Sequence, residues 1–169
     1  MIYRDEKGFT LIELVIVIVL LGIIGVVVSL NLGSLSSIRV NNAIKKMVGD
    51  LRYAQQLAIA TQSRHGLAID STQTYSIHKD TGGVDADIKD PTNLGNNFVV
   101  DFDTYQQGQL NGVRFSSTTP FCGVSVIEFN SSGAPTDTNG TPLACASSIG
   151  FAGSSGTILI EPNTGKLTY

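Results

Sequence analysis

The sequence has few of the side chains on which enzyme active sites are usually built. Its 169 residues include two histidines, His65 and His78, two cysteines and no tryptophan. It contains no Gly-x-Ser-x-Gly nucleophile motif and no Gly-rich phosphate loop. His65 is expected to cap a helix end, and His78 to lie at a strand end. We therefore expect a protein that is not an enzyme and holds no cofactor.

Charge is also sparse, at 15% of all residues. The 11 basic and 14 acidic side chains leave a net charge of -3, which is too small to indicate a polyanionic partner or an acidic tail. From Gln62 to the C-terminus there are five basic and ten acidic side chains, a net charge of -5. DNA binding there would need a local basic patch. The sequence does not favour DNA as a partner.

Cys122 and Cys145 are the only cysteines. If they are joined, the disulfide closes a loop of 24 residues and stabilises the fold by about 3.5 kcal/mol through chain entropy. Such a bond would indicate an oxidising compartment. The alternative is two buried thiols that pack as small apolar side chains. Neither spacing nor neighbours suggest a metal site at these residues.

One long apolar run, residues 9–30, is interrupted by a single charge, Glu13. As a helix, its 22 residues would extend about 33 Å, enough to cross the hydrocarbon core of a bilayer. The run exceeds the apolar core of about 7–15 residues found in secretory signal peptides. A simple membrane anchor explains its length but not Glu13, because a carboxylate in lipid costs about 3 kcal/mol.

The charged leader ends in Lys7-Gly8 and is followed by Phe9-Thr-Leu-Ile-Glu13-Leu. This pattern resembles the processing motif of type IV prepilins, which include the pseudopilins of type II secretion. The resemblance implies that prepilin peptidase cleaves between Gly8 and Phe9, and that the new terminus at Phe9 is N-methylated. It also implies that Glu13 pairs with the terminal amine of a neighbouring subunit during assembly. The alternative is that Glu13 reaches the lipid headgroups from the first helical turn.

The same resemblance implies partners and a location. The partners are other pilin or pseudopilin subunits, prepilin peptidase, an inner-membrane assembly platform and membrane lipid. The protein would cross the bacterial inner membrane once, with its leader in the cytoplasm and its head in the periplasm, and would reach the cell surface in a filament. Basic residues flank both ends of the apolar run, so charge alone does not orient it.

Four segments are predicted along the chain: a leader at 1–8, a transmembrane and assembly helix at 9–30, an amphipathic helix at 31–65, and a β-rich head at 66–169. Apolar residues spaced by three or four form one stripe in the amphipathic part: Ile44, Met47, Val48, Leu51, Ala54 and Ala58. Gly66 is the predicted end of the helix.

Short apolar alternations separated by turn-forming residues predict strands in the head, at residues 67–69, 75–78, 98–102, 113–115, 124–129, 157–161 and 166–169. The expected fold class is α+β, with the long helix packed on an antiparallel sheet. A type IV pilin fold is what the resemblance implies.

A second resemblance is narrower. The helix-to-strand junction LRYAQQLAIATQSRHGLAI, the Ile127-Glu-Phe129 segment followed by Gly133, and the closing GTILIEPNTGKLTY are similar to those of GspH/FimT-like minor pilins. Such subunits are often placed at a filament tip, and some relatives bind DNA. Residues 79–123 match poorly.

Asp85, Asp87 and Asp90 are the candidate metal ligands, because calcium prefers several carboxylate oxygens. Their spacing is not that of an EF-hand loop, and a solvated charged loop explains them equally well. The leading hypothesis is a structural minor pilin or pseudopilin. The alternative is a single-span, membrane-anchored envelope domain that binds a ligand or polymer, DNA included, through its β head.

Overall fold

The computed structural model describes residues 8, 10–82 and 85–169, and gives the backbone alone for residues 26–34. The chain divides into two compact units, Met1–Leu35 and Ser36–Tyr169. The second contains all the strands that the structure describes.

Helix α1 runs from Leu11 to Thr61. The first proline of the chain is Pro91, so every residue of this segment keeps the backbone N–H that a helix needs. The helix ends where Gln62 adopts a left-handed conformation, with φ of 54°, and where its side chain donates to the Ile59 carbonyl at 2.7 Å. The prediction that Gly66 stops the helix is wrong, since Gly66 lies within the first strand.

The head contains eleven strands among the residues that the structure describes. They are β1 His65–Ile69, β2 Thr74–Asp80, β3 Asp85–Asp87, β4 Lys89–Asp90, β5 Asn93–Asn97, β6 Val99–Asp101, β7 Val126–Phe129, β8 Pro135–Thr136, β9 Ser147–Gly150, β10 Thr157–Ile160 and β11 Leu167–Thr168, with a short 3-10 helix, η1, at Tyr105–Gln107. All pairings between them are antiparallel.

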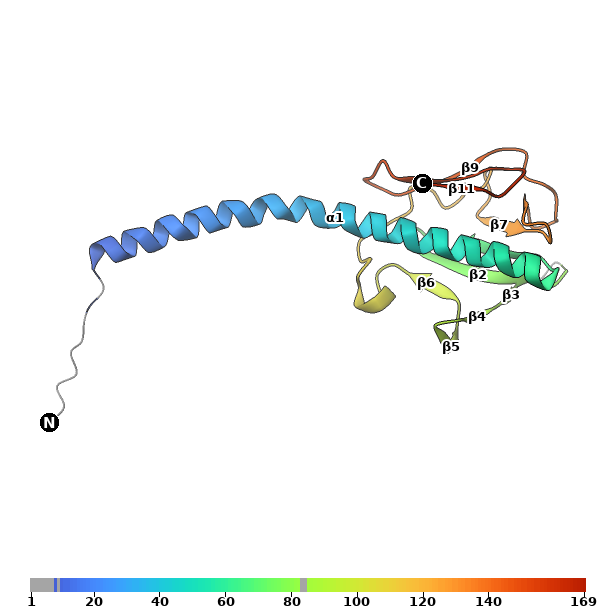
Figure 1. Cartoon of the computed structure of the whole chain (residues 1–169), viewed down its shortest axis with the longest axis horizontal. Helices are drawn as coiled ribbons and strands as arrows, with labels where there is room; N and C mark the ends of the chain where they lie inside the picture. Colours follow the sequence, from blue (N-terminus) through green and yellow to red (C-terminus); the bar gives the residue numbers. More distant parts are fainter. Residues whose placement is uncertain (1–7, 9, 83–84) are drawn as a thin grey trace. The chain divides into compact units, whose positions relative to one another are not determined.

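The strands form three sheets. The largest has the order β3-β2-β1-β7-β8, with β6 also paired to β2. A second sheet has the order β11-β10-β9, and β4 pairs with β5 in a small third one. Figure 1 shows the strands beside the C-terminal part of α1. The predicted α+β class is confirmed, and its helix packed on antiparallel sheets is consistent with a pilin fold.

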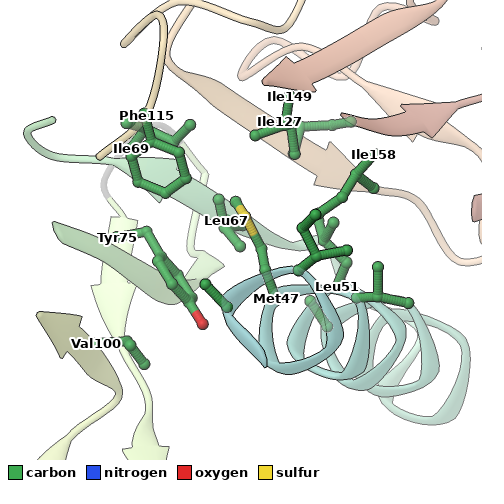
Figure 2. Packing of buried hydrophobic residues seen from close by; sticks show 14 of the residues in the cluster. Met47, Leu51, Leu67, Ile69, Tyr75, Val100, Phe115, Ile127, Ile149 and Ile158 are labelled. Carbon is green, nitrogen blue, oxygen red and sulfur yellow. The ribbon is translucent and has the colours of Figure 1, made fainter. Parts of the chain in front are cut away.

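The hydrophobic core lies between α1 and the sheets. The predicted apolar stripe is confirmed, because all six of its residues are buried. In Figure 2, Met47 and Leu51 of the helix lie close to Leu67 of the large sheet and to Ile158 of the three-stranded one. The helix therefore joins two sheets that share no backbone pairing in the described chain.

Two kinds of difference separate the predicted strands from the observed ones. Residues 113–115 are not a strand, since Phe115 makes only an isolated bridge with Phe151. Strands β3, β4, β5, β8 and β9 were not predicted. Most of β3 to β5 is exposed, so the apolar alternation that marks a half-buried strand is missing there.

Candidate functional site

A disulfide joins Cys122 to Cys145, whose Cα atoms are 6.0 Å apart. Cys122 lies in a turn close to the isolated bridge between Phe121 and Val124, and Cys145 lies shortly before β9. The bond therefore ties the loop before β7 to the segment that enters the three-stranded sheet.

The three predicted calcium ligands do not share one group in the structure. Asp85 and Asp87 belong to β3, and Asp90 belongs to β4. Asp87 accepts a hydrogen bond from the Asn97 side chain at 2.7 Å, whereas Asp90 accepts from the backbone and hydroxyl of Thr92, both at 2.7 Å. Asp85 instead lies beside residues from other strands.

Asp85, His78 and Glu128 form the one group of potential metal ligands found among the described residues. The His78 Nε2 atom is 3.7 Å from an oxygen of Asp85 and 3.7 Å from an oxygen of Glu128. Glu128 is fully buried, His78 is 3% exposed, and Asp85 is 44% exposed. The cluster thus combines two buried side chains with one exposed carboxylate.

Arg64 lies on the other side of Glu128. Its Nε atom is 2.9 Å from the second Glu128 oxygen, and its guanidinium also pairs with Asp80. A buried carboxylate is costly unless a positive charge or hydrogen bonds compensate it. Arg64 supplies that compensation to one Glu128 oxygen and leaves the other facing His78.

Gly66 gives Glu128 and His78 the room to approach each other. It lies in β1 between them, since it pairs with His78 on β2 and with Glu128 on β7. A Cβ atom on Gly66 would lie 2.3 Å from the Ile127 carbonyl oxygen and 2.9 Å from Glu128 Cγ. Because Gly66 has no side chain, β1 can approach β7 closely, and His78 and Glu128 can come together across β1.

A second buried carboxylate, Asp50, lies on the sheet-facing side of α1. Both of its oxygens accept hydrogen bonds from Lys46 at 2.6 Å, and one also accepts from the Tyr75 hydroxyl at 2.6 Å. Burial raises the pKa of Asp50, against the opposing effects of Lys46 and Tyr75. The Lys46 ammonium also lies over the Phe98 and Tyr105 rings. Asp50 therefore bonds to a residue of its own helix and to a buried tyrosine of β2, which indicates a structural role.

At the start of α1, Thr10 caps the helix. Its hydroxyl accepts a hydrogen bond from the Glu13 backbone N–H at 3.3 Å, the usual bond of an N-cap residue. Glu13 is the acidic residue of the first turn, where a negative charge is favoured by the helix dipole. Of the predicted cleavage residues, Gly8 is exposed, whereas Phe9 lies outside the described residues.

The turns that follow Glu13 expose apolar side chains on all sides. From residue 11 to residue 24, twelve Leu, Ile and Val side chains are between 43% and 82% exposed. An apolar surface of this size marks a site of association with protein or membrane. Within the described part of the chain, no helix is long and apolar enough to cross a membrane.

Residues 3–29 match the prokaryotic N-terminal methylation motif. The match contains Gly8, Phe9 and Glu13, and it supports a type IV pilin-like prepilin that is processed by prepilin peptidase and assembles with other pilins. No curated protein and no solved structure matches the chain. The narrower assignment to the GspH/FimT-like minor pilins stays a prediction.

The sequence does not predict Arg64 and Glu128 as members of a polar cluster, and it predicts His78 only as a strand-end residue. One signal was present: Glu128 is a lone acid in the apolar strand Val126–Phe129. A charge inside a strand whose neighbours are buried needs a compensating partner. The identity of that partner depends on strand order, which the sequence did not reveal.

Proposed function

We propose that the chain is a structural subunit, a minor pilin or pseudopilin, that is inserted in the inner membrane, processed before Phe9 and assembled into a type IV pilus or a type II secretion pseudopilus. The observation that carries this proposal is the methylation motif at residues 3–29. The motif supports a processing site ahead of a helix with exposed apolar side chains.

The exposed helix supports assembly. Each large apolar side chain buried between subunits or in lipid contributes about 1.5–3 kcal/mol, so twelve of them supply a strong driving force. Gly22 and Gly25 lie in the same stretch, and a Cβ on either would meet no atom within 4 Å in the described residues. These glycines leave space for a neighbouring helix to approach closely.

Mass spectrometry of the mature chain purified from its native host tests the proposal. The expected mass is that of a chain beginning at Phe9 and carrying one methyl group. The Gly8→Ala variant should be measured in the same way. A Cβ at Gly8 meets no described atom within 4 Å, so the substitution changes only the residue before the cleavage site. A mature chain that retains Met1 would refute processing and favour the simple membrane anchor.

A further inference from the structure

We propose that His78, Asp85 and Glu128 form a zinc site that links three strands of the head. The three residues come from β2, β3 and β7, and their ligand atoms all lie within 4.8 Å of one another. One imidazole nitrogen with two carboxylate oxygens is a donor set that suits zinc, which commonly takes three protein ligands and leaves a fourth position open.

The buried atoms of the cluster have unmet bonding capacity. Both ring nitrogens of His78 and both oxygens of Glu128 are without a hydrogen-bond partner in the described part of the chain. The contact of Glu128 with Arg64 is close enough for an ion pair but is not aligned as a hydrogen bond. Since buried polar groups are nearly always bonded, the His78 Nε2 atom and the Glu128 oxygen that faces it point to a ligand between them.

The spacing is close to what zinc requires. Tetrahedral coordination with bonds of about 2.0–2.1 Å places ligand atoms about 3.3 Å apart. The His78 Nε2 atom is 3.7 Å from each carboxylate oxygen, and the three ligand atoms all lie within 4.8 Å of one another, so the side chains would draw together by up to about 1.5 Å around the ion. Asp85 lies at the exposed edge and gives the ion access from solvent.

The charge of the cluster also suits a dication. Arg64 contributes one positive charge, and Asp80, Asp85 and Glu128 contribute three negative ones, which leaves a net charge of -2 when the imidazole is neutral, as metal binding requires. Arg64 contacts one Glu128 oxygen and can hold the carboxylate in orientation while the other oxygen binds. Calcium is disfavoured, because it takes six to eight oxygen ligands.

The site would act as a cross-link between strands of the head. It would connect β2 and β7, which are separated by β1 in the sheet, and would secure β3 at the sheet edge. A ligand that binds the folded state alone stabilises it by an amount that grows with ligand concentration. Zinc should therefore raise the unfolding temperature of the head.

The test uses the full chain in detergent, purified without a histidine tag, stripped with chelator and dialysed. Isothermal titration calorimetry with Zn²⁺ should give a stoichiometry of one ion per chain. Co²⁺ in place of Zn²⁺ should give the visible absorption spectrum of a tetrahedral complex. Asp85→Asn keeps the size of the side chain and should weaken zinc binding by about tenfold or more, since even outer-shell changes cost about 10–100-fold. Folded Glu128→Gln should show a similar loss of zinc affinity.

Asp90→Asn is the matched control, because Asp90 is a neighbouring acid outside the cluster and an asparagine can still accept the bond from Thr92. Its zinc affinity should equal that of the unmodified chain. The proposal is overturned if the folded chain takes up no zinc, if Asp85→Asn binds as tightly as the parent, or if Asp90→Asn loses as much affinity as Asp85→Asn.

Discussion

At the scale of single residues, the Tyr75 hydroxyl is one of the hydrogen-bond donors that stabilise the buried carboxylate of Asp50. Tyr75 is fully buried and donates to Asp50 at 2.6 Å. Tyr75→Phe should lower the free energy of unfolding by about 1–3 kcal/mol, because it leaves a buried carboxylate with one donor fewer. Urea denaturation followed by circular dichroism measures the change.

Tyr53→Phe is the control for this prediction. Tyr53 is a partly buried tyrosine of α1 whose ring contacts Phe98, and its hydroxyl makes no hydrogen bond within the described residues. Removing that hydroxyl should change stability little. Equal losses in the two variants would contradict a specific role for the bond between Tyr75 and Asp50.

Asp50 should also give the head a pH-dependent stability. Its pKa is raised above 3.8, chiefly by burial, so its contribution to stability is fully present below about pH 3.8 and is lost as the pH rises through the folded-state pKa. The unmodified chain should therefore lose stability relative to Asp50→Asn as the pH is raised from 3 to about 7. Paired urea titrations across this window measure the difference, and a constant or growing advantage of the parent would count against it.

At the scale of elements, Gly66 allows β1 to fit between β2 and β7. Gly66→Ala should destabilise the head by about 1–3 kcal/mol, since the new Cβ would meet the β7 backbone and force the strands to shift.

Gly49→Ala is the matched variant and should raise the stability of the head instead. Gly49 is exposed within α1 and has open space around its Cα, so alanine there should stabilise by about 0.5–1 kcal/mol. Melting curves of both variants test the pair, and an unchanged Gly66→Ala melt would refute the close approach.

The disulfide constrains two separate elements, the loop before β7 and the segment before β9. Reducing it should lower the free energy of unfolding by about 3.5 kcal/mol, through the entropy of the open loop. Denaturation of the oxidised chain and of the reduced, alkylated chain measures this loss. Cys122→Ser combined with Cys145→Ser should match the reduced chain and not the oxidised one. Coincident transitions for all forms would show that the bond does not stabilise the head.

The elements differ in how much of them the sequence predicts. The stripe from Ile44 to Ala58 is predictable, because buried residues of a helix recur every three or four positions. Strands β3 to β5 are not, because their residues are polar and mostly exposed. The grouping of His78, Asp85 and Glu128 cannot be predicted from the sequence either, for a different reason. Its members are 50 residues apart at the extremes, and only the order of the strands brings them together.

At the scale of the whole molecule, Glu13 should decide between a chain that remains in the membrane and one that assembles. Glu13→Gln removes the charge and keeps the size of the side chain. The Thr10 cap uses the Glu13 backbone N–H, so the helix start should be preserved. We expect cleavage before Phe9 to continue while incorporation into filaments falls about tenfold or more, because a terminal amine left without its acid in an apolar interface costs about 3–5 kcal/mol.

Glu161→Gln is the control for this change, because Glu161 is an exposed glutamate of the head that contacts Lys166 and Thr164. Mass spectrometry of the membrane fraction reports cleavage, and immunoblots of sheared filaments report incorporation. Filaments that contain as much Glu13→Gln as parent subunit would contradict the pairing of Glu13 with the terminal amine. Loss of cleavage together with assembly would instead assign Glu13 to recognition by the peptidase, since a pairing role acts only after the new terminus exists.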